Sequence, residues 1–227
     1  MKRILLTWAS SGLGFELAKL FHEKWFEVIA LGRHKPEIDI QYISLDLTSG
    51  ESIQQAVQHI KSEYSTFDCL LHCAGDGKVE CIDDINFSDA DSTFRLNVVW
   101  PLALTAWLFD LIKKNEADVL SIVATIGLKW YQHMTTYSAA KRGQTGFVEN
   151  LQLELKWTKS RVISVYPWGM QTESNVGEQG RDTQLRKITG KSSSGSMLDP
   201  KEIAKIVFDI YSLPKNIEVS EIIINRK

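Results

Sequence analysis

The sequence has little cysteine, little net charge and no long apolar run, and each lack excludes a class of protein. Three cysteines cannot all pair, which argues against a disulfide-stapled fold and favours a reducing compartment. A formal net charge of −2 gives no electrostatic reason to bind nucleic acid or an anionic membrane. No segment is expected to supply the roughly 20 apolar residues of a membrane span. We therefore expect a cytoplasmic protein with neither nucleic acid nor a membrane as partner.

Two features of the sequence resemble those of secreted proteins and of metal-binding proteins. The first residues, Met1 to Leu6, resemble the charged and apolar regions of a signal peptide, but the apolar run ends at Ser10, which is short for such a segment. Cys69, Cys73 and Cys81 lie close together, as in a metal site. Because Cys69 and Cys73 fall on or beside an apolar segment typical of a buried strand, where small thiols are common, we expect no metal.

Short apolar runs alternate with longer stretches of helical period, a pattern that predicts βαβ units and a parallel sheet. The expected strands are 3–7, 27–31, 41–45, 67–71, 119–123, 161–166 and 218–224, and the expected helices are 13–23, 50–64, 88–113, 135–156 and 200–211. Neither an internal repeat nor a linker is visible. The sequence thus predicts a single α/β domain over residues 1–227, a doubly wound, Rossmann-like parallel sheet of about seven strands with helices on both faces.

The chain opens with a pattern typical of a phosphate-binding turn. A strand, Arg3 to Thr7, leads through Trp8–Gly14 into a helix. Such a turn aims backbone N–H groups and the positive end of the helix at one point, and in a βαβ unit the usual guest is a dinucleotide. Trp8 stands where this turn normally has a glycine.

Tyr137 and Lys141 are spaced i and i+4, so they lie on one face of a helix. An ammonium group close to a phenol is expected to lower the tyrosine pKa, and such a tyrosine can exchange a proton with a carbonyl or alcohol oxygen. The alternative is a surface tyrosine packed on a lysine stem. The order of the motifs, with the phosphate turn first and a loop containing Gly127 just before the pair, favours the catalytic interpretation.

Taken together, these motifs resemble the short-chain dehydrogenase/reductase family over essentially the whole chain. Asp46–Leu47 resembles the family's adenine contact, Ala74–Gly75 the loop after the fourth strand, Asn97 the asparagine of the proton relay, and Pro167–Thr172 the nicotinamide loop. The resemblance implies catalysis by Tyr137, Lys141 and Asn97, with Lys141 also holding the nicotinamide ribose. It implies a cofactor site of Thr7, Ser10, Ser11, Gly12, Leu13, Gly14, Arg33, Asp46, Leu47, Ala74, Gly75, Tyr137, Lys141, Pro167, Gly169, Met170 and Thr172.

Arg33 follows the second expected strand, where an acidic residue would bind the ribose 2′-hydroxyl of NAD. With His34 and Lys35 behind it, Arg33 suits a 2′-phosphate, which favours NADP(H) over NAD(H). The alternative is a solvated loop cation.

The sequence departs from the family at the serine that lies thirteen residues before the tyrosine, because Ala124 occupies that position. Thr125 could supply the missing hydroxyl if the loop turned by one residue; otherwise the site lacks a donor whose loss can cost on the order of 10²–10³ in rate. His72 stands in a cofactor-loop position, where we expect it to lie behind the adenosine.

Tryptophan occupies six positions where family members often carry glycine: Trp8, Trp25, Trp100, Trp130, Trp157 and Trp168. Trp25 and Trp157 are expected just after helices in the left-handed conformation, and Trp8 and Trp168 are expected to crowd the cofactor. The pattern suggests that glycines of a parent sequence have been replaced.

Two functions therefore compete. The first is an NADP(H)-dependent oxidoreductase that interconverts a small carbonyl compound and its alcohol. The second is a catalytically weak relative that serves as a nucleotide-binding or regulatory module, favoured by Ala124, Trp8 and Trp168. In both cases we expect a homo-oligomer, a dimer or tetramer formed through the two longest helices, and a mobile substrate lid over residues 173–197.

Overall fold

The computed structural model describes residues 1–178, 180–191 and 197–227. Its centre is one sheet with the strand order β3-β2-β1-β4-β5-β6-β7, and every neighbouring pair is parallel. The strands are β1 (Arg3–Thr7), β2 (Glu27–Gly32), β3 (Gln41–Ser44), β4 (Cys69–His72), β5 (Asp118–Ile122), β6 (Val162–Pro167) and β7 (Glu221–Ile224). The predicted doubly wound parallel sheet is thus confirmed, and its order reverses direction between β1 and β4, where such sheets bind ligands.

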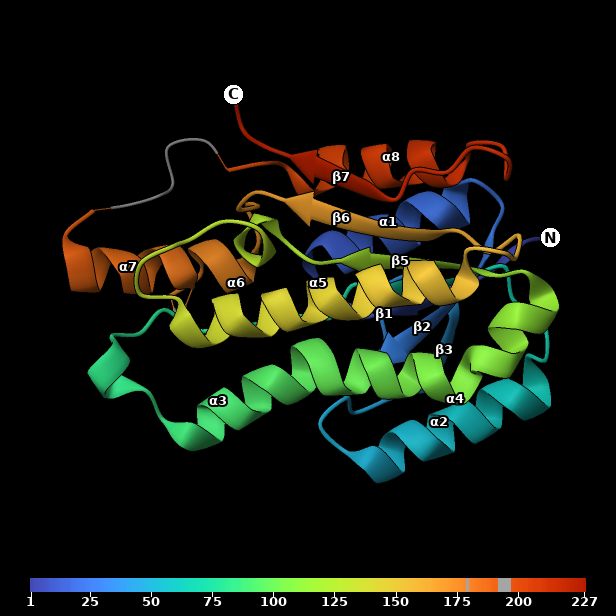
Figure 1. Ribbon diagram of the computed structural model, residues 1–227, viewed down its shortest axis with the longest axis horizontal. Helices are drawn as coiled ribbons and strands as arrows, with labels where there is room; N and C mark the ends of the chain where they lie inside the picture. The colour runs from blue at the N-terminus through green and yellow to red at the C-terminus, as the bar shows by residue number, and fades with distance from the viewer. Residues whose placement is uncertain (179, 192–196) are drawn as a thin grey trace.

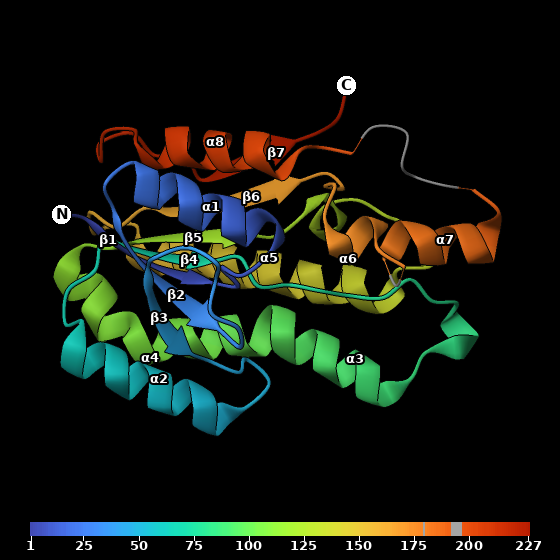
Figure 2. The same ribbon diagram turned by 180° about the vertical axis from the view of Figure 1, so that it is seen from behind.

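Helices cover both faces of the sheet (Figures 1 and 2). The helices are α1 (Gly12–Glu23), α2 (Gly50–Glu63), α3 (Phe87–Phe94), α4 (Trp100–Asn115), α5 (Thr135–Leu155), α6 (Glu173–Val176), α7 (Arg181–Thr189) and α8 (Pro200–Tyr211). One face packs against α1 and α8, and the other packs against α2, α4 and α5.

The two cores follow from the alternation of side chains along each strand. In β1, Leu5 belongs to the core beneath α2, α4 and α5, whereas Ile4 and Leu6 belong to the core beneath α1 and α8. All three side chains are fully buried. A strand covered on both faces is mostly apolar, which is why the central strands appear in the sequence as short apolar runs rather than as an alternating pattern.

Two regions differ from the expected pattern. The single helix expected over 88–113 is α3, a π-helical segment (Arg95–Val99) and α4 in succession. The region 173–197, expected to be irregular, contains the helices α6 and α7, and residues 179 and 192–196 of the expected lid lie outside the described residues. A π-helical turn inserts an extra residue and changes the direction of the side chains that follow, so it can place a polar group where a regular helix could not.

The continuous helix Phe87–Asn115 is long and apolar enough to cross a membrane by length and composition, with a mean hydropathy of 1.3 in its most apolar window. The sequence was expected to contain no such segment. In the structure this helix packs beside α2 and α5, and Leu104, Leu108 and Ile112 are fully buried in the core beneath the sheet. Part of its apolar character is therefore used within the fold, since 33% of the most apolar window is buried.

Candidate active site

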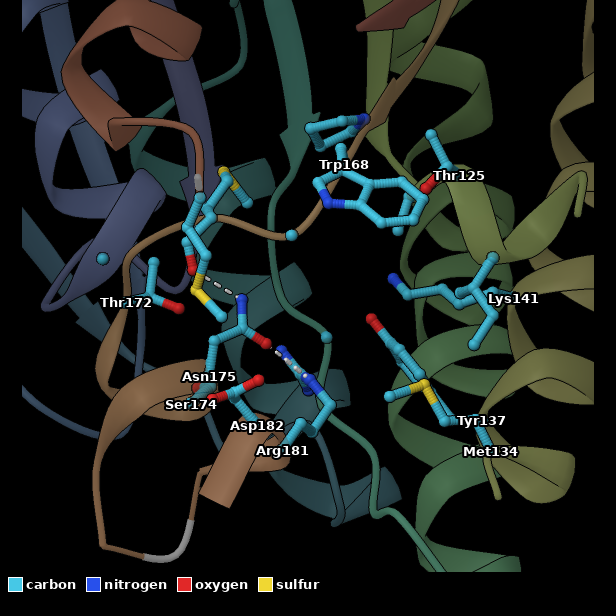
Figure 3. A pocket seen from close by; sticks show the side chains of 18 of the residues that line it. Thr125, Met134, Tyr137, Lys141, Trp168, Thr172, Ser174, Asn175, Arg181 and Asp182 are labelled. Atoms are coloured by element: carbon cyan, nitrogen blue, oxygen red, sulfur yellow. Dashed lines mark hydrogen bonds between the residues drawn. The ribbon is translucent and has the colours of Figure 1, made fainter. Parts of the chain in front are cut away.

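A cavity of about 580 Å³ opens at the carboxyl ends of β1, β4, β5 and β6 and is bordered by α6 and α7 (Figure 3). It brings together twelve of the residues predicted for the site: Ser11, Gly12, Leu13, Gly14, Gly75, Thr125, Tyr137, Lys141, Pro167, Gly169, Met170 and Thr172. These residues come from five separate loops and helices. A volume of this size fits a small-molecule or cofactor site.

The other predicted residues lie outside the lining of this cavity. Asn97 is buried just behind it, and Leu47 is packed into the apolar core. Thr7 and Ala74 tie two loops together, because the Thr7 hydroxyl oxygen accepts hydrogen bonds from the backbone N–H groups of Cys73 (3.0 Å) and Ala74 (3.2 Å). Ser10 lies in the turn after β1.

The phosphate turn has the geometry expected of an anion cradle. Ser11 is the N-cap of α1, and its side chain caps none of the free N–H groups of the first turn. Gly12 has a φ of +53°, which favours glycine. At Gly14 a Cβ atom would lie 1.9 Å from the carbonyl oxygen of Trp8, so only glycine permits this close approach. The free N–H groups and the positive end of α1 fit a pyrophosphate.

Tyr137 and Lys141 occupy one face of α5, and both side chains point into the cavity (Figure 3). Tyr137 is 7% exposed and Lys141 is 2% exposed. The Lys141 ammonium lies 5.8 Å from the centre of the Tyr137 ring and donates to Gln144 Oε1 at 2.8 Å and to the Ile122 carbonyl at 3.4 Å. These partners are neutral, and within the part of the chain that the structure describes no carboxylate forms an ion pair with this buried lysine.

Burial dominates the acidity of both groups. Desolvation, together with the charge of the neighbouring Arg181, lowers the pKa of Lys141 to about 7. Desolvation also raises the pKa of Tyr137 above its ordinary value, against the opposing effect of Arg181. The expectation that Lys141 lowers the tyrosine pKa is therefore wrong for the protein alone. A cation that is itself costly to bury stabilises a phenolate less than the loss of water destabilises it.

Asn97 lies in the π-helical segment and is fully buried. Its amide nitrogen donates to the carbonyl oxygens of Asp76 (2.7 Å) and Thr93 (2.8 Å), while its Oδ1 has no hydrogen-bond partner among the described residues. A Cβ atom at Gly75 would lie 2.6 Å from Lys141 Nζ and 2.9 Å from Asn97 Oδ1. Glycine at this position thus leaves room between the lysine and an unpaired buried acceptor.

Ala124, at the position of the family's serine, has a φ of +131°, a conformation that costs on the order of 1–3 kcal/mol for a non-glycine residue. The neighbouring Thr125 lines the cavity, and its hydroxyl lies 3.4 Å from that of Tyr131. Tyr131 in turn packs against Trp168, with ring centres 5.2 Å apart. The structure therefore places a hydroxyl of Thr125 at the cavity wall, beside an aromatic pair.

The tryptophans at glycine-like positions differ in backbone conformation and in whether they line the cavity. Trp8 (φ +63°) and Trp25 (φ +64°) adopt the left-handed conformation that favours glycine. The left-handed conformation expected for Trp157 is wrong, because α5 ends through Lys156 with ordinary helical angles and Trp157 has no positive φ. Trp8 and Trp168 both line the cavity, so their indoles share this space with any ligand.

Sequence reasoning missed Arg181 and Asn175, which come from the polar stretch that it treated as a loop. The Arg181 guanidinium lies 5.1 Å from the centre of the Tyr137 ring, and its Nε donates to Asn175 Oδ1 at 2.8 Å. Arg181 also forms an ion pair with Asp76 at 2.9 Å. The helix over 181–189 is strongly polar, so it lacks the apolar stripe by which a helix is normally recognised in a sequence.

Two other polar features lie away from the chemistry. His72 is buried at the end of β4 and pairs with the Thr105 hydroxyl of α4 at 2.8 Å, and burial lowers its pKa to about 4. It is a neutral core residue. Cys81, Asp83 and Asp84 place their sulfur and oxygen atoms within 4.8 Å of one another, with both carboxylates exposed.

Comparisons with known proteins agree with this geometry. The family model described as short chain dehydrogenase matches residues 2–182. A sepiapterin reductase of Chlorobaculum tepidum is 27% identical over 99% of this chain and 96% of its own length. An NADP-dependent 3-hydroxy acid dehydrogenase of Schizosaccharomyces pombe is 26% identical over 98% of this chain and 92% of its own.

Solved structures share the fold. An alcohol dehydrogenase from the archaeon Thermococcus sibiricus, complexed with 5-hydroxy-NADP, has a TM-score of 0.84 at 18% identity, covering 99% of this chain and 96% of its own. A serine dehydrogenase in its closed form with NADP⁺ has a TM-score of 0.84 at 22% identity, covering 97% and 94%. The family match spans most of the chain, including the phosphate turn and the tyrosine–lysine pair. This chain belongs to the short-chain dehydrogenase/reductase family of oxidoreductases.

Proposed function

We propose that the protein is an NADP(H)-dependent oxidoreductase that interconverts a carbonyl compound and its alcohol, with Tyr137 as general acid and base. The observation that carries this proposal is one cavity that holds the open N-terminus of α1 together with the side chains of Tyr137 and Lys141. One part suits a dinucleotide phosphate and the other suits proton exchange with a substrate oxygen.

A bound nicotinamide would supply or accept the hydride. Tyr137 would donate a proton from its hydroxyl to the carbonyl oxygen during reduction and take it back during oxidation. Lys141 would hold the ribose and restore the tyrosine proton, helped by Asn97 through its unpaired Oδ1. A lysine with a pKa near 7 can both give and accept a proton at neutral pH, which suits a relay. Thr125, which lines the cavity, would polarise the carbonyl.

The cofactor preference rests on the end of β2. Arg33 is exposed there, and its guanidinium lies 6.0 Å from the centre of the Trp8 ring. The charge of Arg33 also contributes to lowering the pKa of Asp46, whose main cause is the hydrogen bond from the Thr48 backbone N–H. A guanidinium beside the adenosine end of the cradle supports a 2′-phosphate, and hence NADP(H).

The chief alternative is a catalytically weak relative, and it is favoured in the sequence by Ala124, Trp8 and Trp168. The cavity keeps a volume of about 580 Å³ with both indoles in its wall, and the Thr125 hydroxyl faces it. These observations support an enzyme over a binding module.

The partners proposed are a small carbonyl or alcohol substrate and further copies of the same chain. Apolar side chains are exposed on the π-helical segment, α4 and α5, among them Val99, Leu102 and Leu153, which are 42%, 46% and 67% exposed. Burial of such side chains is the ordinary driving force for association, so a dimer or tetramer through these helices is expected. With small-molecule partners and no proposed membrane contact, we place the enzyme in the cytoplasm.

The test pairs calorimetry with turnover. Wild-type protein should bind NADPH saturably and more tightly than NADH. Tyr137→Phe should lower the rate of carbonyl reduction by about 10²–10⁴-fold, because it removes only the proton donor, and should leave NADPH affinity nearly unchanged. Normal turnover by this variant would overturn the mechanism, and a folded wild type that binds neither nucleotide would overturn the proposed function.

A further inference from the structure

Arg181 is a cation held inside the cavity, beside the tyrosine proposed to exchange the proton. It projects from the start of α7, and its side chain is 13% exposed. Its guanidinium carbon lies 5.1 Å from the centre of the Tyr137 ring, and Figure 3 shows the two side chains facing each other across the cavity. The proposed proton transfer gives this cation no role.

The position of Arg181 is fixed by its neighbours. Nε donates to Asn175 Oδ1 at 2.8 Å, and Asn175 Nδ2 in turn donates to the Met170 carbonyl at 2.7 Å. Nη1 pairs with Asp76 Oδ1 at 2.9 Å. Asn175 is 8% exposed, so it forms a buried support for the guanidinium. A guanidinium supported at Nε and Nη1 is held in place before any ligand arrives, which lowers the entropy cost of binding.

The third guanidinium nitrogen of Arg181, Nη2, is available to bind a ligand. Within residues 1–178, 180–191 and 197–227, no acceptor is hydrogen-bonded to Arg181 Nη2, and this atom is not among the buried polar atoms that lack a partner. Nη2 therefore keeps access to open space, and Arg181 itself lines the cavity. An accessible guanidinium edge that borders a substrate cavity is a binding group for a planar anion.

We propose that Arg181 binds a carboxylate of the substrate, so that the enzyme acts on a short hydroxy acid or the corresponding oxo acid; this inference rests on the proposed function. A carboxylate carries one charge and offers two coplanar oxygens that match a guanidinium edge. The carboxylate of Glu173 also lines the cavity and disfavours a more highly charged group such as a phosphate more strongly than a single carboxylate.

The spacing limits the length of the substrate. In the proposed reaction the substrate oxygen contacts the Tyr137 hydroxyl, and the guanidinium carbon lies 5.1 Å from the centre of the same ring. This closeness favours a carboxylate separated from the reacting carbon by a short spacer. A 3-hydroxy or 3-oxo acid fits this requirement.

A purely structural role competes with this assignment, because the ion pair with Asp76 fastens α7 to the loop after β4. The two roles respond differently to Asp76→Asn, which removes the ion pair while Asn175 Oδ1 and the Gly77 carbonyl still accept hydrogen bonds from the guanidinium. Asp76 is half exposed, so this substitution is tolerated by the fold. If Arg181 only fastens α7, Asp76→Asn and Arg181→Gln should act alike.

The experiment compares 3-hydroxybutanoate with its methyl ester, both oxidised with NADP⁺. In the wild type, kcat/KM should favour the acid. In Arg181→Gln the ratio of acid to ester should fall by about 10- to 100-fold, because a charge-assisted hydrogen-bonded contact is lost. Arg181→Lys should restore part of the ratio, and Asp76→Asn should keep it. An unchanged ratio in Arg181→Gln, or an equal loss in Asp76→Asn, would overturn the assignment.

Failure of the two proposals can be told apart. If the wild type oxidises the ester but does not prefer the acid, the proposed function stands and the carboxylate assignment is wrong. If neither compound is oxidised, calorimetric titration of 3-hydroxybutanoate into the wild type and Arg181→Gln decides the assignment without turnover. Saturable binding that the variant loses supports it, and absence of binding to the wild type overturns it.

Discussion

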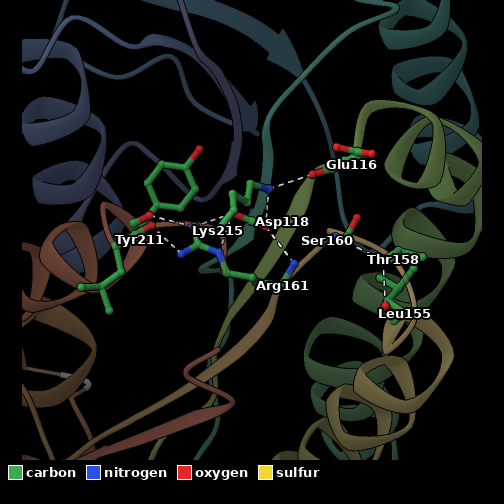
Figure 4. A network of polar contacts seen from close by, with 9 residues as sticks. Glu116, Asp118, Leu155, Thr158, Ser160, Arg161, Tyr211 and Lys215 are labelled. Atoms are coloured by element: carbon green, nitrogen blue, oxygen red, sulfur yellow. Dashed lines mark hydrogen bonds and ion pairs between the residues drawn. The ribbon is translucent and has the colours of Figure 1, made fainter. Parts of the chain in front are cut away.

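The two ends of the sheet both bury charge, but they treat it in opposite ways. At the amino end, Asp118 is fully buried and accepts hydrogen bonds from the Arg161 backbone and guanidinium and from Lys215, at distances between 2.6 and 3.2 Å (Figure 4). At the carboxyl end, among the described residues, buried Lys141 has only neutral partners and Asn97 Oδ1 has none.

Backbone strain occurs at both ends of the sheet, because Trp25 (φ +64°) and Glu116 (φ +52°) precede β2 and β5 at the amino end, but only at the carboxyl end does it border a cavity. Trp8 and Ala124, with φ of +63° and +131°, both lie at the carboxyl end and line the cavity. Unpaired polar groups and strained residues lower stability, and those that border a cavity are available to a ligand or a reaction. The comparison teaches that one end of this sheet holds the fold together, while the other keeps groups free for chemistry.

Of the substitutions that test this comparison, Asp118→Asn should change the free energy of unfolding most. The substitution leaves Arg161, which is 6% exposed at its side chain, without its buried counter-charge. Removing one partner of a buried ion pair costs about 3–5 kcal/mol. We expect a loss of this size in the free energy of unfolding, measured in urea, with NADPH affinity of the folded protein retained.

The matched control is Lys159→Gln, which removes the exposed ion pair between Lys159 and Glu116 at the same end of the sheet. Exposed pairs contribute about 0–1 kcal/mol, so this variant should be nearly as stable as the wild type. Equal losses of unfolding free energy in Asp118→Asn and Lys159→Gln would show that the buried network stabilises the fold no more than an exposed ion pair does.

A second effect concerns the pH dependence of stability at the carboxyl end. The pKa of Lys141 is about 7 in the folded protein, against 10.5 as its ordinary value. Between these values the unfolded chain binds a proton that the folded protein lacks, so unfolding takes up a proton and stability rises with pH. The rise is at most about 1.4 kcal/mol per pH unit, and it is absent below pH 7, where both states are protonated.

Lys141→Met should remove this rise. Urea unfolding of the wild type and the variant between pH 6 and pH 9 measures the difference directly, because all other titrating groups are shared. The wild type should gain stability relative to the variant above pH 7. If the plots of unfolding free energy against pH ran parallel for the two proteins, the folded protein would not lower the pKa of Lys141, and burial of its ammonium group would carry no such cost.

The sequence predicted one end of the sheet much better than the other. The strands, their parallel arrangement and the residues around the turn and α5 could be predicted because apolar runs and the Tyr137–Lys141 spacing are local patterns. The Asp118 network could not, since Asp118, Arg161 and Lys215 meet only through the strand order. Arg181 was missed for the same reason, because its partner Asp76 is 105 residues away.

The smallest expected effects come from two tryptophans with nearly the same backbone. Trp8 and Trp25 have φ of +63° and +64°, but Trp8 lines the cavity and Trp25 is an 85% exposed residue just after α1. Replacement by glycine relieves a left-handed strain of about 1–2 kcal/mol and adds freedom to the unfolded chain, so a net gain of up to about 1 kcal/mol is expected. For Trp8 the gain is smaller, because its indole packs against the core.

Only one of the two should change nucleotide binding. Trp8→Gly should tighten NADPH binding several-fold, because an indole in the wall of the phosphate cradle competes for space with the pyrophosphate, whereas Trp25→Gly relieves similar strain far from the cavity and should leave affinity unchanged. Calorimetric titration of both variants separates steric crowding from backbone strain. Equal tightening in both would assign the effect to the backbone, and no change in Trp8→Gly would show that the indole lies clear of the bound phosphate.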